Sequence, residues 1–99
     1  MEGISKLKVP GGKLLIVKIR YGAKIEGIQI LGDFFLHPED SLKDIEDSLV
    51  GISAAASEEE IARIVDSVIR REGIEAIGIT PEAIAGSVKG AMKNGMESS

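Results

Sequence analysis

The sequence predicts an α+β domain in which an antiparallel three-stranded sheet is covered by about three helices, as in a two-layer sandwich. Two aliphatic runs flank a short turn that contains Gly, which is typical of an antiparallel hairpin. Three later segments carry apolar residues at helical spacing, between residues that start and stop helices. With 99 residues, the chain is long enough for one domain and too short for two.

Composition excludes several classes of function. The chain contains no Cys, which excludes disulfides, thiol catalysis, iron–sulfur ligation and thiolate zinc sites. Its one His cannot by itself form a multi-histidine metal centre, and a formal net charge of −4 argues against general nucleic-acid binding. No apolar run approaches the roughly 20 residues of a membrane span. The first residues lack a signal-peptide pattern, so the cytoplasm is the expected compartment.

The hairpin is predicted over residues 13–21 and 25–31. Alternation in the first run produces one apolar face, formed by Leu15, Val17 and Ile19, and an opposite face that becomes polar at Lys18 and Arg20. In the second run, strict alternation places Ile25 on the opposite face from Ile30. The intervening turn contains Gly22, which supplies an unusual backbone angle where one is needed.

The segments on either side of the hairpin are less regular. A short third strand, or an extended edge, is predicted at residues 33–36. Residues 1–12 mix basic and apolar residues and end in the strong break Pro10-Gly11-Gly12. We expect them to form a flexible N-terminal arm that is ordered only if something holds it. Residues 13–95 then form the domain, and residues 96–99 a frayed tail.

The first two helices are predicted from their ends. His37-Pro38-Glu39-Asp40 is a helix entry, because Pro is tolerated in the first turn and acidic residues suit the positive end of the helix dipole. Gly51 ends this helix after the apolar positions Leu42, Ile45 and Leu49. Ser57 and Glu60 form a capping box at the start of the second helix, and Gly73 ends it. Its apolar stripe is Ile61, Ile64, Val65, Val68 and Ile69.

The last third of the chain predicts a connector and a third helix. Residues 74–79 are expected to be an extended connector that buries Ile74 and Ile77. Thr80-Pro81 then starts a helix, because Thr is a favoured N-cap and Pro a favoured first helical residue. Gly95 is expected to end this helix, whose apolar face is thinner than that of the second helix.

The segment from Gly32 to Asp40 is the first candidate site. It contains both Phe residues, the only His and three carboxylates, and it lies at a strand-to-helix junction, where sites often lie. One interpretation makes His37 a general base oriented by Asp33 or Glu39. The other is structural, with both Phe residues in the core and the carboxylates serving a turn and the helix dipole. A metal site built from one His and scattered carboxylates is disfavoured.

Two further patterns involve charge. Pro10-Gly11-Gly12-Lys13 invites a phosphate-binding interpretation, but it lacks the spacing of a P-loop and its Lys opens a strand, which favours a simple entry to that strand. The first helix carries an acidic face formed by Asp40, Asp44, Glu46 and Asp47. This face is either simply solvated or a docking surface for a basic partner. The first third of the chain is basic through Lys6, Lys8, Lys13, Lys18, Arg20 and Lys24. Such a charge separation can steer and orient a partner.

Three motifs occur together in residues 11–51. They are a strand that begins at Gly12-Lys13, a strand end that reads Ile28-Gln29-Ile30-Leu31-Gly32-Asp33-Phe34-Phe35, and a helix with Leu42, Ile45, Glu46, Leu49 and Gly51. In this combination the chain resembles the small accessory domain of lipoate–protein ligases, which usually follows the catalytic domain in bacteria and is a separate short subunit in some archaea. The resemblance covers most of the chain after Pro10 and implies a SufE/NifU-like two-layer fold.

The resemblance also implies a function and a partner. In that family the catalytic domain binds ATP and lipoate, forms lipoyl-adenylate and transfers the lipoyl group to a Lys of an acceptor domain. This chain would be a non-catalytic accessory subunit in a heterodimer with the catalytic large subunit, and it would reach the lipoyl-acceptor domain only through that complex. ATP, Mg and lipoate would belong to the complex. The residues expected to border the partner interface are Gly32, Asp33, Phe34, Phe35 and His37, with Lys18 and Arg20 facing an anionic site.

Two other classes of function stay open at this point. One is a scaffold or regulatory module with a SufE/NifU-like fold that binds a different partner and has no effect on lipoylation. The other is a small independent enzyme that uses His37 and nearby carboxylates. Loss of an activity of the isolated chain on His37→Ala would identify the enzyme. Inactivity alone, together with equimolar association with a ligase large subunit, would identify the accessory subunit.

Overall fold

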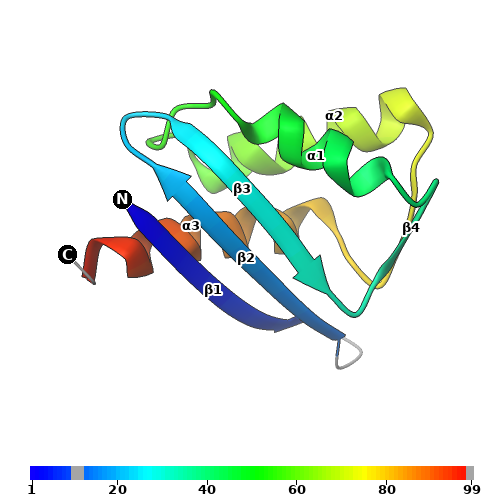
Figure 1. The fold of residues 1–99 in the computed structure, drawn as a ribbon. Helices are drawn as coiled ribbons and strands as arrows, with labels where there is room; N and C mark the ends of the chain where they lie inside the picture. The colour runs from blue at the N-terminus through cyan, green and yellow to red at the C-terminus, as the bar shows by residue number, and fades with distance from the viewer. Residues whose placement is uncertain (10–12, 98–99) are drawn as a thin grey trace.

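The computed structural model describes residues 1–9 and 13–97 and confirms the predicted α+β class (Figure 1). A three-stranded antiparallel sheet with the strand order β1-β2-β3 forms one layer, and the helices form the other. Strands β4 and β5 form a separate two-stranded ribbon. In chain order, the elements are β1 (Glu2–Val9), β2 (Lys13–Tyr21), β3 (Ile25–Gly32), β4 (Phe35–His37), α1 (Ser41–Leu49), α2 (Glu58–Glu72), β5 (Glu75–Ile77) and α3 (Pro81–Glu97).

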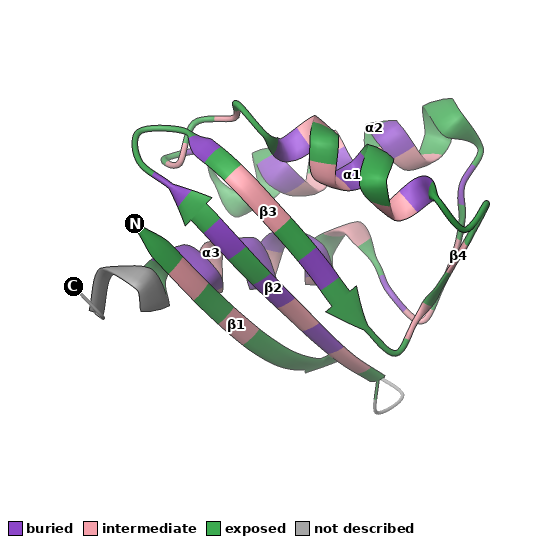
Figure 2. Cartoon of the chain, viewed as in Figure 1, coloured by how far each residue is buried: buried purple, intermediate pink, exposed green. Residues whose placement is uncertain are grey.

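The predicted hairpin of β2 and β3 is confirmed. As Figure 2 shows, β2 alternates between buried and more exposed residues, and those buried are Leu15, Val17, Ile19 and Tyr21. A β-bulge between Arg20 and Tyr21 shifts the register, so that Ile25 pairs with Tyr21 and Gly27 with Arg20. The extra residue of a bulge changes the face on which its neighbours lie. Ile25 is therefore buried together with Ile30, and the prediction that it lies on the opposite face is wrong.

Residues 2–9 form an edge strand, β1, where the sequence predicts a flexible arm. β1 pairs antiparallel with β2 along its whole length, and α3 packs against its inner side. The Ser5 hydroxyl donates a hydrogen bond to the Ser87 carbonyl oxygen of α3 at 2.7 Å. The strand is ordered because β2 and α3 both hold it. Residues 10–12, which belong to the same expected arm, lie outside the described residues.

The third strand of the sheet is thus β1, and not residues 33–36 as predicted. The chain leaves the sheet after Gly32, and β4 pairs with β5 in the ribbon, with Phe35 opposite Ile77. Ile74 is buried as expected, but Ile77 is 56% exposed. The prediction for Ile77 is wrong because strand alternation turns its neighbour Ala76 towards the core and Ile77 away from it.

The signals at the ends of the second helix are confirmed in α2. The Ser57 hydroxyl accepts a hydrogen bond from the Glu60 N–H at 3.1 Å, and Gly73 ends the helix in the left-handed conformation with φ of 64°. The first helix, α1, starts at Ser41, directly after the predicted entry, and ends at Leu49. Its N-cap residue, Asp40, makes no side-chain capping hydrogen bond.

The third helix, α3, starts as predicted and runs further. The Thr80 hydroxyl accepts a hydrogen bond from the Ala83 N–H at 3.1 Å, as expected of an N-cap. The helix continues to Glu97, two residues beyond the predicted stop at Gly95. Of the expected frayed tail, residues 98–99 lie outside the described residues. Within the described ranges, no helix is long and apolar enough to cross a membrane.

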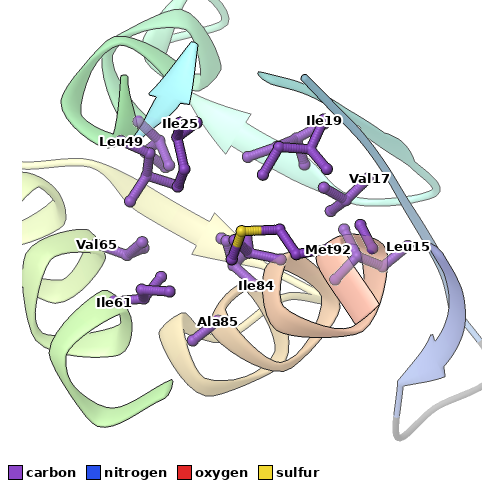
Figure 3. Close-up of a cluster of buried hydrophobic side chains, with 14 of the residues drawn as sticks. Leu15, Val17, Ile19, Ile25, Leu49, Ile61, Val65, Ile84, Ala85 and Met92 are labelled. Atoms are coloured by element: carbon purple, nitrogen blue, oxygen red, sulfur yellow. The ribbon is translucent and has the colours of Figure 1, made fainter. Parts of the chain in front are cut away.

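Branched aliphatic residues from both layers form most of the core (Figure 3). Labelled contributors from β2, β3, α1, α2 and α3 are Leu15, Val17, Ile19, Ile25, Leu49, Ile61, Val65, Ile84, Ala85 and Met92. Tyr21 joins the two layers, because its buried hydroxyl donates a hydrogen bond to the Met92 carbonyl oxygen at 2.5 Å. The layers are therefore fixed relative to each other by side chains from β2, β3 and all three helices.

Candidate functional site

The chain leaves the sheet through the Gly-Asp-Phe-Phe segment, residues 32–35. The Asp33 N–H donates a hydrogen bond to the Leu14 carbonyl oxygen at 3.0 Å, which ties this exit to β2. A Cβ atom on Gly32 would lie 2.2 Å from that same oxygen and 2.7 Å from a ring carbon of Phe34. Both distances are well inside van der Waals contact, and backbone cannot move aside as a flexible side chain can. Glycine is therefore required at this position while Phe34 packs over it.

The two Phe residues of the segment point in opposite directions. Phe34 is half-buried and packs against the core, whereas Phe35 is 73% exposed. Directly opposite Phe35 on β5 lies Ile77, which is 56% exposed, and cross-strand neighbours of this kind lie within reach of each other. We call them the Phe35–Ile77 pair. The structural interpretation that placed both Phe residues in the core is right for Phe34 only, and the exposed apolar pair is typical of an interaction site.

His37 lies at the exposed end of β4. Its cross-strand neighbour is Glu75, and a cis peptide bond joins it to Pro38. The two carboxylates considered as its orienting partners, Asp33 and Glu39, are exposed as well. Among the described residues, no group of three or more His, Asp or Glu side chains is arranged to hold a metal ion. His37 is thus an exposed residue at the end of the ribbon, beside Glu75.

The sheet also has an open face, which we define as the side of β1, β2 and β3 turned away from the helices (Figure 1). Lys18 and Arg20 are exposed on it, as alternation predicts. The register of β1 adds Lys6 and Lys8 to the same face. The Arg20 Nε lies 3.6 Å from the Glu26 Oε1, and both side chains are more than half exposed, so this ion pair contributes little to stability.

The acidic face predicted on the first helix is divided by the structure. Glu46 is half-buried, and its Oε2 accepts a hydrogen bond from the Ile30 N–H of β3 at 2.7 Å. Glu46 thus satisfies a backbone donor of β3, the edge strand opposite β1, and makes β3 less available for pairing with a strand of another chain. The other three residues are exposed, as a solvated face would be: Asp40, Asp44 and Asp47.

Sequence reasoning missed one member of the Phe35–Ile77 pair. The short aliphatic run around Ile77 contains no sequence pattern that predicts an exposed residue. Only the pairing of β5 with β4 shows that Ile77 lies on the surface beside Phe35. The glycine-rich candidate, Pro10-Gly11-Gly12, lies outside the described residues, while Lys13 opens β2 as predicted. The structure therefore presents two candidate interaction surfaces, the Phe35–Ile77 pair and the open face.

No protein-family model and no curated protein matches the chain. Among solved structures, it is similar to a chain from the structural analysis of an archaeal lipoylation system, a bipartite lipoate protein ligase and its E2 lipoyl domain from Thermoplasma acidophilum. The TM-score is 0.73 and the sequence identity 31%, over 89% of this chain and 94% of that chain. The likeness supports a part for this chain in protein lipoylation. Since it extends over nearly the whole of both chains, the chain belongs to the accessory-subunit family of lipoate–protein ligases.

Proposed function

We propose that this chain is the accessory subunit that a separate catalytic subunit of lipoate–protein ligase requires to activate lipoate. The observation that carries the proposal is the likeness to the Thermoplasma acidophilum system, at 31% identity over 94% of that chain. The ligase of that system is bipartite. A bipartite ligase divides one activity between two chains, and a chain of 99 residues whose described part contains no group of His and carboxylates that could hold a metal ion suits the smaller part.

The physical chemistry of lipoate activation gives such a subunit a role. Adenylate formation joins two anionic reactants, lipoate and ATP, and requires a site that holds them together and excludes water. A small rigid domain docked beside that site can order its loops without contacting the substrates. We place ATP, Mg²⁺ and lipoate on the catalytic subunit, because the described residues of this chain offer no cluster of carboxylates and His that fits a metal ion.

The Phe35–Ile77 pair supports a protein partner. Apolar side chains that stand 73% and 56% exposed on a ribbon lose contact with water when a partner covers them. A few such anchors often supply most of the binding free energy of an interface. The pair includes one residue of the Gly-Asp-Phe-Phe segment, on which the resemblance to the accessory domain rests. We therefore assign the pair to the contact with the catalytic subunit in an equimolar complex.

An experiment that separates the two half-reactions tests this function. The catalytic subunit of the source organism is incubated with an acceptor lipoyl domain, with or without this chain, and lipoylation is measured by intact-mass spectrometry. Starting from ATP and lipoate, we expect lipoylation only when both chains are present. Starting from synthetic lipoyl-adenylate, we expect the catalytic subunit alone to suffice. Association of the two chains with no effect on either reaction would contradict the proposal and support a scaffold role.

A further inference from the structure

The open face combines positive charge with aliphatic surface. Its cations come from two neighbouring strands and are Lys6, Lys8, Lys18 and Arg20. On the same face lie Ile4, opposite Lys18, and Leu31, on β3 opposite Ile16, which are 42% and 37% exposed. A sheet face that is only solvated usually carries polar residues at these positions. Exposed aliphatic residues among cations instead suit a surface that is itself apolar and acidic.

The charge of the molecule is divided between its two sides. On the open face, four cations stand against two carboxylates, Glu2 and Glu26, so this face carries a net charge of +2. The whole chain carries −4, so the remaining residues carry −6. An acidic partner is therefore attracted to the open face and repelled by the rest of the molecule, and such an arrangement favours one orientation of docking.

The open face also contains a shallow hollow at Gly27. The hollow has a volume of about 610 Å³, and its lining includes Ile4, Lys18, Arg20, Gly27 and Gln29. Gly27 adds no side chain to this lining, and a Cβ atom there would meet only the end of the Arg20 side chain, at 3.4 Å. The aliphatic stems of Lys18 and Arg20 can line such a hollow while their charges stay in water.

We propose that the open face docks an acidic surface of the catalytic ligase subunit and that the hollow at Gly27 receives one apolar side chain of that surface. This inference rests on the proposed function and names the face through which it acts. Leu31, at the end of β3, precedes Phe35 by only four positions, so the open face and the Phe35–Ile77 pair are adjacent along the chain.

Calorimetric titration of the catalytic subunit with variants of this chain tests the proposal. Lys18→Glu reverses a charge on the open face, and Arg63→Glu makes the same change in net charge on the exposed side of α2. Gly27→Leu places an apolar side chain in the hollow. We expect Lys18→Glu and Gly27→Leu each to raise Kd by at least about tenfold, and Arg63→Glu to leave it within about twofold. Thermal unfolding of each variant shows that the fold is kept.

The outcomes separate this proposal from the proposed function. If the native chain and all three variants bind the catalytic subunit equally well, the open face is not the docking surface, although the accessory function stands. If the native chain does not bind the catalytic subunit at all, the proposed function fails. Light scattering of the isolated chain covers a third case: a dimer that Lys18→Glu dissociates, with ligase binding unchanged, would assign the face to a second copy and overturn the proposal.

Discussion

The missing side chain at Gly32 determines how the polypeptide turns from the sheet into the ribbon. Space for a Cβ atom is taken by the Leu14 carbonyl oxygen on one side and the Phe34 ring on the other. With Phe34 held inward at this point, alternation turns Phe35 outward, opposite Ile77. One glycine thus connects a packing requirement in the core with the exposure of an apolar side chain on the surface.

Replacement of Gly32 by Ala should destabilise the protein. The added methyl group would lie 2.2 Å from a backbone oxygen, and such overpacking costs about 1–3 kcal/mol of the free energy of unfolding. Gly27→Ala is the matched control, because its Cβ would meet only a flexible Arg20 nitrogen at 3.4 Å, and we expect a change within about 0.5 kcal/mol. Urea denaturation measures both. Equal stability of the two variants would show that the exit at Gly32 is not sterically restricted.

Replacement of Phe35 by Ala should separate binding from stability. Because Phe35 is 73% exposed, we expect the free energy of unfolding to change by no more than about 0.5 kcal/mol. The affinity for the catalytic subunit should fall by about 30-fold or more, as for an interface anchor. Val50→Ala serves as control, since Val50 is also exposed, at 46%, but lies outside both candidate surfaces. Unchanged affinity of the Phe35→Ala protein would remove the pair from the interface.

At the scale of elements, the sequence predicts the helices well, misses β1 and assigns the short strand after Gly32 to the wrong sheet. Helix ends depend on local signals such as Ser57 and Gly73, and these are confirmed. β1 lacks an apolar alternation, because its inner side includes the small residues Gly3 and Ser5. These fit a close approach of α3, where a Cβ atom on Gly90 would lie only 3.7 Å from the Ser5 Cβ. The reason for a strand at residues 2–9 is thus a contact with a helix about 80 residues away.

The candidate site could be predicted only in part, because some of its features depend on local sequence and others on contacts between distant segments. The Gly-Asp-Phe-Phe segment and the outward direction of Lys18 and Arg20 follow from local sequence. The pairing of Phe35 with Ile77 does not, because it joins segments about 40 residues apart. The hollow at Gly27 does not follow either, because its lining includes Ile4 of β1, a strand that the local sequence does not reveal.

The edge of β3 provides a prediction at this scale. Removal of the Glu46 carboxylate by Glu46→Ala leaves the Ile30 N–H without its acceptor, and a partly buried donor left unpaired costs about 1–3 kcal/mol. Glu46→Gln keeps an acceptor oxygen and should lose less. Thermal and urea unfolding of the two variants give the comparison. If both variants lose equal stability, the charge of Glu46, rather than its hydrogen bond to β3, is what matters.

At the scale of the whole molecule, charge is unevenly divided, with a net charge of +2 on the open face and −6 on the rest of the chain. Such a division acts over distance, unlike the apolar contacts, and it affects how fast and in which orientation a partner arrives. The Phe35–Ile77 pair and the hollow act only after contact. We therefore expect charge to govern the rate of association and apolar burial to govern the lifetime of the complex.

The rate of association with the catalytic subunit should consequently depend on salt. The Debye length falls from about 10 Å at 0.1 M to about 3 Å at 1 M ionic strength, so steering by the open face is lost across this range. Stopped-flow measurements should show a fall in the association rate constant of about tenfold or more. For the Lys18→Glu protein the dependence should be flatter. A rate that does not change with salt would contradict electrostatic steering.

Lipoate-dependent exchange of pyrophosphate into ATP tests most directly whether this chain is required for lipoate activation. It is measured with the catalytic subunit alone, with this chain alone, and with both. Exchange reports lipoyl-adenylate formation without any transfer step. We expect no exchange by either chain alone. When the two chains are mixed, exchange should be restored, and its rate should saturate at an equimolar ratio. Exchange by the catalytic subunit alone, at a rate that this chain does not change, would contradict an accessory role in activation.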